Sequence, residues 1–111
     1  MMSITHHQDG IFTVVSMEGR FDALGAREFK KIISQLLEMQ QKRIVLSMAQ
    51  VSFIDSSGMG ALVGILRQMT HEGGDMRIAA LLPEVHTIFE LTRLHRIFDI
   101  YDTVSAAITA G

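Results

Sequence analysis

Residues 43–70 have the sequence RIVLSMAQVSFIDSSGMGALVGILRQMT, which predicts a strand, a turn and a helix in succession. Residues 43–48 are largely apolar, the pattern of a strand that is covered on both faces and therefore of a parallel sheet. From residue 57 to about residue 70, apolar residues recur at spacings of three and four, which predicts a helix. The apolar stripe of that helix comprises Met59, Leu62, Val63, Leu66 and Met69.

The segments on either side continue this alternation of strands and helices. Residues 11–17 predict a strand, with which Ile4 and its neighbours can pair as a hairpin through Asp9 and Gly10. A helix is expected from about Ala23 to Met39, with Asp22 as its cap. The remaining elements are a turn at Gly73-Gly74, a strand over 76–81, a helix from Pro83, a strand over 97–101 and a helix after Asp102-Thr103. This order predicts an α/β domain with a mixed, mostly parallel sheet, an N-terminal hairpin and about four helices.

Composition narrows the classes of protein that need to be considered. The 111 residues, 48% of them hydrophobic, suffice for one domain with one core. A net charge of -2 with scattered Lys and Arg argues against a nucleic-acid partner. The chain has no cysteine, no apolar signal-peptide core and no run of about 18 apolar residues, so we expect a cytoplasmic protein without membrane insertion. Apart from the adjacent pair His6-His7, the histidines lack metal-ligand spacing, and we expect no metal site.

The turn within residues 51–60 carries the chemistry of the chain. Asp55-Ser56-Ser57-Gly58 places an acid and two hydroxyls at a helix N-terminus, where free backbone N–H groups and the positive end of the helix dipole lie. A phosphate on either serine would be tolerated there, with a gain of ~0.3–1 kcal/mol. The same phosphate adds about -1.5 to -2 charges, which can cost several kcal/mol when a partner has to cover them. Phosphorylation would therefore abolish binding and leave the domain folded.

Other interpretations of this segment remain open. An aspartate or serine before a helix is usually only a cap. Helical projection places Gly60, Ala61 and Gly64 on the less apolar side, and glycines there indicate close approach by another backbone, from a partner or from a neighbouring helix. Gly58-Met59-Gly60 lacks the lysine and spacing of a phosphate-binding loop, and Gly-x-Ser-x-Gly is absent. No histidine or lysine is placed in sequence to activate a serine, so we expect no catalytic residues and no enzyme.

The succession of strand, Asp-Ser-Ser-Gly-Met-Gly, apolar helix, Gly-Gly and strand resembles the bacterial anti-sigma factor antagonist group of the STAS domain family. The likeness extends over nearly the whole chain, so residues 1–111 are expected to form one STAS domain. Gly19-Arg20-Phe21-Asp22 is similar to the Gly-x-apolar-Asp that precedes the family's first helix. In the last third of the chain, the family has similar residues at the positions of Pro83, Phe89, Leu94 and Phe98.

The resemblance implies a phosphorylation site and a binding surface. Its phosphoacceptor is the serine directly after the aspartate, which is Ser56, whereas helical projection alone places Ser57 nearer the centre of the exposed side. The implied partner-binding residues are Asp22, Asp55, Ser57, Gly58, Met59 and Gly60. Two positions depart from the family pattern: Ser47 stands where an acidic or amide residue is common, and Arg93 where glycine is frequent.

The resemblance also implies partner switching. The unmodified protein would bind an anti-sigma factor that is also an ATP-dependent serine kinase, and a sigma factor would be released. Phosphorylation would end that binding and a metal-dependent serine phosphatase would restore it, so that ATP and magnesium belong to the kinase and this chain has no cofactor. The alternative is a non-switching STAS subunit that docks permanently on a transporter ATPase or another regulatory complex. The sequence leaves monomer and dimer open.

Overall fold

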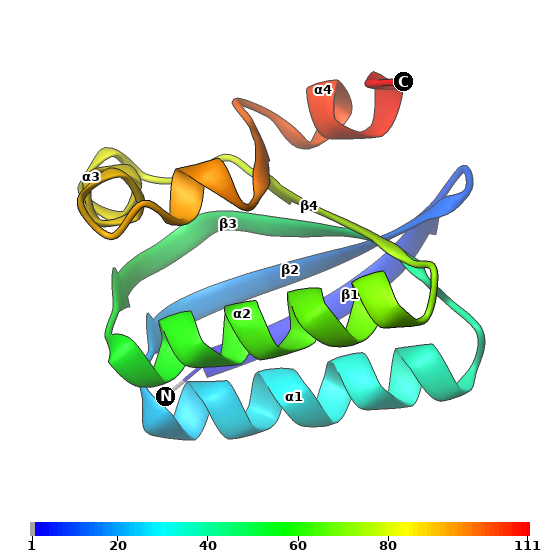
Figure 1. Cartoon of the computed structure of the whole chain (residues 1–111), viewed down its shortest axis with the longest axis horizontal. Coiled ribbons are helices and arrows are strands. Elements are labelled where there is room, and N and C mark those ends of the chain that lie inside the picture. Colours follow the sequence, from blue (N-terminus) through cyan, green and yellow to red (C-terminus); the bar gives the residue numbers. More distant parts are fainter. Residues whose placement is uncertain (1) are drawn as a thin grey trace.

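A five-stranded sheet lies at the centre of the computed structural model, which describes residues 2–111. The strands lie in the order β1-β2-β3-β4-β5, and β1 (Met2–Asp9) and β2 (Phe12–Phe21) form the predicted antiparallel hairpin. The remaining strands, β3 (Arg43–Ile54), β4 (Asp75–Ala79) and β5 (Asp99–Tyr101), run parallel to β2. The predicted α/β class with a mixed, mostly parallel sheet is therefore confirmed (Figure 1).

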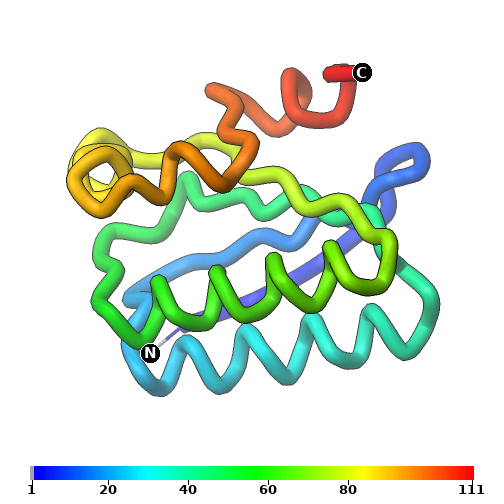
Figure 2. Tube along the Cα trace, viewed as in Figure 1, coloured from blue at the N-terminus to red at the C-terminus, as the bar shows by residue number. Residues whose placement is uncertain are grey.

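The helices form a layer on each side of the sheet (Figure 1). On one face α1 (Ala23–Glu38) and α2 (Ser56–His71) run alongside each other and begin at the same end of the molecule (Figure 2). On the other side follow α3 (Pro83–Leu91), the short 3-10 helix η1 (Leu94–Arg96) and α4 (Val104–Thr109). The larger apolar core includes the residues between the sheet and the pair α1 and α2 and extends to Val85, Phe89, Leu94 and Phe98 around α3 and η1. A smaller core lies beneath α4. No helix within residues 2–111 is long and apolar enough to cross a membrane.

The ends of the helices follow the predicted capping chemistry. Asp22 caps α1 and Thr103 caps α4, each through a side-chain oxygen that accepts a backbone N–H. Pro83 occupies the first turn of α3, where its missing N–H costs nothing. The predicted helix starts at these three places are confirmed.

Both β2, which continues to Phe21 although the sequence predicts its end at residue 17, and β3 are longer than predicted. The hydrophobic run in β3 stops at residue 48, but the strand continues to Ile54 because it keeps pairing with β2, up to Ile54 opposite Phe21. The register of this pair shifts twice, between Ser16 and Glu18 and between Gly19 and Arg20. Several residues of the extension are polar or half-exposed, so hydrophobic pattern alone does not mark them as strand.

The last third of the chain departs further from the prediction. The strand expected over 97–101 is only Asp99–Tyr101, because Phe98 turns into the core and packs against Phe89, with ring centroids 6.1 Å apart. The helix η1 was not expected. The strand expected over 76–81 ends at Ala79, and Ala80 adopts a left-handed conformation with φ 63°.

The apolar stripe of α2 is rotated relative to the prediction. The buried residues are Gly58, Ala61, Leu62, Ile65 and Met69, whereas Met59, Val63 and Leu66 are only half-buried. The placement of Ala61 on the less apolar side was wrong, since it is 1% exposed. The physical reason is that α2 packs on α1 as well as on the sheet, so its buried arc includes small residues at the helix–helix contact.

Candidate functional site

The N-termini of α1 and α2 lie side by side at the end of the sheet where the inner strands β2 and β3 finish. Because β2 and β3 are parallel neighbours and Phe21 pairs with Ile54, the next residues, Asp22 and Asp55, lie at equivalent points of the two strands. The N–H of Asp55 donates to the carbonyl oxygen of Phe21 at 3.3 Å, which holds the two strand ends together. The topology therefore brings both predicted aspartates to one surface.

Both aspartates cap the helix that follows them. Asp22 Oδ1 accepts the N–H of Gly25 at 3.1 Å, and Asp55 Oδ1 accepts the N–H groups of Ser57 at 2.9 Å and Gly58 at 3.1 Å. The N–H of Gly25 is the main cause that holds the pKa of the Asp22 carboxyl below its ordinary value, with a smaller contribution from the nearby Arg20 guanidinium. These carboxylates satisfy backbone N–H groups at the start of α1 and α2 and so fix their first turns.

A glycine three residues after each aspartate lets the helix approach the end of β2. A Cβ atom at Gly25 would lie 2.8 Å from the carbonyl oxygen of Arg20, and one at Gly58 would overlap the carbonyl oxygen of Phe21. Gly58, one of the predicted partner-binding residues, is buried beneath the surface, and its missing side chain is explained by this contact within the chain. Glycine is needed here for packing.

The two later glycines of α2 have a different environment. A Cβ atom at Gly60 or Gly64 would meet nothing within 4 Å, and both residues are exposed. They therefore do not serve packing against a neighbouring helix of the same domain, which was one of the two interpretations of these glycines. The surface at Gly60 is open to close approach by another molecule.

Ser56 and Ser57 are exposed in the first turn of α2 and line a hollow of about 430 Å³ between α1 and α2. The other lining residues are Ala23, Ala26, Arg27 and Lys30 of α1 and Gly60 and Ala61 of α2. The hollow contains both candidate serines, so the geometry alone does not choose between them. Met59 lies next to it along the chain and is half-buried against the core. We call this hollow the α1–α2 groove.

Arg27 and Lys30 belong to the groove but were not singled out from the sequence. Their spacing of three places them on one side of α1. That side faces α2 only because of how the two helices pack on the sheet, which no local sequence signal reveals. The groove thus combines two hydroxyls, two cations and two capped helix N-termini.

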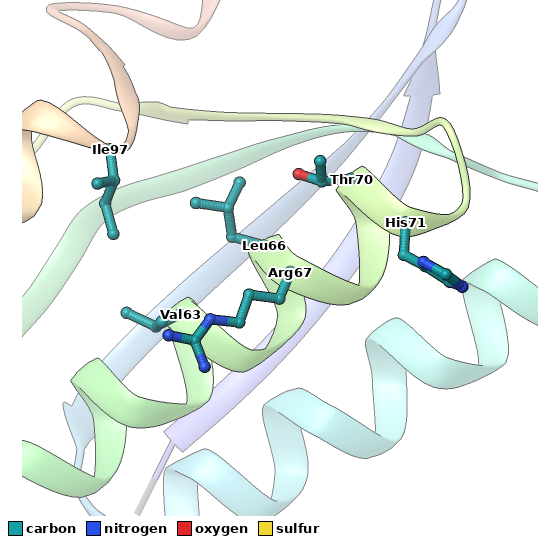
Figure 3. Close-up of a pocket in the computed structure, with 6 residues that line it drawn as sticks. All are labelled: Val63, Leu66, Arg67, Thr70, His71 and Ile97. Carbon is teal, nitrogen blue, oxygen red and sulfur yellow. The ribbon is translucent and has the colours of Figure 1, made fainter.

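A second hollow of about 500 Å³ lies on the other flank of α2. Its walls are Val63, Leu66, Arg67, Thr70, His71 and Ile97 (Figure 3). None of the residues predicted for the site contributes to it. Within residues 2–111, no group of three or more His, Cys, Asp or Glu side chains is placed to hold a metal ion.

The STAS domain family model matches residues 3–107. The chain belongs to the STAS domain family. Along its sequence this STAS domain is similar to the anti-sigma F factor antagonist of Paenibacillus polymyxa, with 28% identity over 109 residues, 97% of this chain and 92% of the relative.

Solved STAS structures share the fold of this chain. An anti-sigma factor antagonist from Mycobacterium paratuberculosis superposes with a TM-score of 0.88 at 22% identity, over 98% of this chain and 92% of that one. The Bacillus cell fate determinant SpoIIAA in its phosphorylated form superposes with a TM-score of 0.74 at 20% identity, over 96% of each chain. At these identities the likeness establishes the fold.

One of the two positions at which this STAS domain departs from the family pattern has a left-handed backbone conformation. Arg93, where the family often has glycine, adopts the left-handed conformation with φ 62° between α3 and η1. Glycine reaches this conformation without the steric cost that a side chain brings. Arg93 is exposed and lies away from the residues that line the α1–α2 groove.

Proposed function

We propose that this chain is an anti-sigma factor antagonist that acts by partner switching, with Ser56 as its phosphorylation site. The observation that carries the proposal is the first turn of α2, where Asp55 makes the cap and Ser56 is exposed beside it on the α1–α2 groove. Because the cap does not depend on Ser56, a phosphate can be added there while the fold persists. The similarity to the anti-sigma F factor antagonist supports the same role.

The unmodified groove is the proposed binding surface for an anti-sigma factor. Ser57 and Gly60 line the groove with Ser56, and Gly60 leaves room for a partner backbone. Asp55 caps the same helix, Asp22 caps the neighbouring one, and Met59 is half-buried next to the groove along the chain. When the anti-sigma factor binds here, its sigma factor is released. Gly58 is buried and contributes to this surface indirectly, because its missing side chain lets α2 lie against the end of β2.

A phosphate on Ser56 opposes that complex much more than it affects the fold. At a helix N-terminus an anion gains only ~0.3–1 kcal/mol. The added charge of about -1.5 to -2 has to be desolvated by any partner that covers it, which can cost several kcal/mol. Since each ~1.4 kcal/mol changes affinity tenfold, the modification releases the partner. SpoIIAA, which has the same fold, was solved in a phosphorylated form.

The kinase and the phosphatase are separate proteins in this proposal. The anti-sigma factor is itself a serine kinase that binds ATP and magnesium and transfers phosphate to Ser56. A serine phosphatase removes the phosphate. This chain is the substrate of both, so it contributes neither catalytic residues nor a cofactor. Ser56 is preferred to Ser57 because it directly follows the capping aspartate, as the family's phosphoacceptor does.

The proposal is tested by incubating the chain with its anti-sigma factor kinase and ATP and mapping the phosphate by mass spectrometry. Ser57→Ala should be labelled like the parent, and Ser56→Ala should not be labelled. In direct binding measurements Ser56→Ala should hold the partner in the presence of ATP, whereas Ser56→Asp should bind at least about tenfold more weakly. Labelling of Ser56→Ala at the parent rate, or equal affinity of the two variants, would contradict the proposal. A stable complex with a transporter and no phosphate in cells would favour the permanent subunit instead.

A further inference from the structure

Two cations of α1 lie across the α1–α2 groove from Ser56. Arg27 and Lys30 are exposed, and they line this groove together with Ser56, Ser57 and Gly60. The ion pairs within residues 2–111 are Arg77 with Asp75 and His86 with Glu90. In the described chain, therefore, Arg27 and Lys30 line the same groove as Ser56 and form no ion pair with a carboxylate.

The neighbouring cation of the same helix has a different position. Lys31 lines a hollow on the β1 side of α1, together with Ile4, Glu28, Ile32 and Gln35. Like Lys30 it is exposed to solvent, but it does not line the groove. Lys31 is therefore a natural internal control for any effect that depends on position in the groove.

We infer that Arg27 and Lys30 form an intramolecular binding site for the phosphate carried by Ser56, an inference that rests on the proposed function. A phosphoserine presents three strong acceptor oxygens and nearly two negative charges. A guanidinium can donate two parallel hydrogen bonds to such a group, and an ammonium adds a compact second charge. The other residues that line the groove, Ala23, Ala26, Ser57, Gly60 and Ala61, are all small, so the groove has no bulky side chain besides the two cations.

The inferred site gives phosphorylation a second effect on a partner. In the unmodified chain, Arg27 and Lys30 are available to acidic groups of a protein that docks on the groove. After modification the phosphate holds both cations, and it competes at the high effective concentration of a group in the same molecule. The modification then removes two positive contacts from the surface while it adds negative charge.

The test uses the full chain with phosphoserine encoded at position 56 during synthesis, so that no kinase is needed. The phosphate is titrated by ³¹P NMR in the parent, in Arg27→Gln/Lys30→Gln and in Lys31→Gln. Nearby cations favour the dianion, so the midpoint in the double variant should be higher than in the parent by at least about 0.5 pH unit. Lys31→Gln should titrate like the parent apart from a small change. The other charges near the groove, Arg20, Asp22 and Asp55, are the same in every sample and cancel from the comparison.

Equal midpoints for the parent and the double variant, or an equal rise in Lys31→Gln, would overturn the inference. Arg27→Lys keeps the charge but loses the two parallel donors of the guanidinium, so its midpoint should lie between those of the parent and the double variant. The outcome is independent of the kinase experiment. Failure of a kinase to modify Ser56 would contradict the proposed function and leave this titration unchanged. Equal midpoints in the titration would contradict the inferred phosphate site and leave the kinase experiment unchanged.

Discussion

Asp22 and Asp55 do the same work in two neighbouring helices. Each follows a strand of the parallel pair, caps the next helix and precedes by three residues a glycine that packs on the end of β2. The capping role of Asp22 can be predicted from sequence because it depends on the next three residues only. The role of Gly58 cannot, because its neighbour, the carbonyl oxygen of Phe21, lies far away in sequence and is positioned by the register of β2 on β3.

The two glycines of the first turns of α2 should respond oppositely to alanine. Gly58→Ala places a methyl group against the carbonyl oxygen of Phe21 and should lower the free energy of unfolding by about 1–3 kcal/mol. Gly60→Ala adds a methyl group in open space within a helix and should raise it by up to about 1 kcal/mol. Urea denaturation at neutral pH measures both. Similar changes for the two variants would show that the contact at Gly58 does not constrain α2.

Asp22 should contribute a pH-dependent part of stability with a defined sign. Because its pKa is lowered in the folded state, the carboxylate stabilises the fold above the ordinary pKa of an aspartate, and this contribution is lost as the pH falls through the lowered value. Asp22→Asn keeps a capping oxygen without the charge. The advantage of the parent over Asp22→Asn should therefore shrink between neutral pH and about pH 3, measured by urea denaturation. An advantage that grows on acidification would contradict the assignment.

At the scale of elements, the helices were easier to predict than the strands. Apolar periodicity and capping residues lie close together in the sequence, so the start of α1 at Ala23 and of α3 at Pro83 could be predicted. The second half of β3 depends on pairing with β2, and the buried arc of α2 depends on contact with α1. Neither partner is visible in the segment itself. The short η1 depends on the same kind of tertiary packing, through the buried Leu94.

One buried cation fixes α4, which is too short to be stable alone. Arg77 of β4 is 8% exposed; its Nη1 donates to the carbonyl oxygens of Ala107 and Ala110 at 2.6 Å each, and its Nη2 donates to Asp75 Oδ2 at 3.0 Å. Its guanidinium also lies 4.8 Å from the centre of the Phe12 ring. Arg77 thereby caps the C-terminal end of α4 and ties it to the sheet.

Arg77→Met should release α4 and leave the groove intact. The change strands two carbonyl oxygens and one carboxylate, and should lower the free energy of unfolding by about 2–3 kcal/mol. Hydrogen exchange should speed up in α4 with little change in the first turns of α1 and α2. The exposed Arg96→Met is the matched control and should stay within about 0.5 kcal/mol of the parent. Faster exchange confined to α2 would refute the anchoring role.

At the scale of the whole molecule, the sheet separates the proposed binding surface from the helix α4. The α1–α2 groove lies at the end of the sheet where β2 and β3 finish, and α4 packs on the opposite face (Figure 1). The alternation of strands and helices sufficed to predict the fold class, and the family likeness singled out the Asp55-Ser56 turn as the proposed phosphorylation site. The cations Arg27 and Lys30 could not be placed beside that turn from sequence, because the packing of α1 on α2 is decided by the core that both share.

This separation also offers a practical handle for watching the protein at work. The chain has no cysteine, so Ser105→Cys on the exposed side of α4 would supply a unique thiol for a fluorescent dye. The dye would lie across the sheet from the proposed binding surface, so its rotational anisotropy would report complex formation there without direct contact between the label and the bound protein. If the proposed cycle operates, anisotropy should rise when the anti-sigma factor kinase is added, fall when ATP follows, and rise again after the phosphatase.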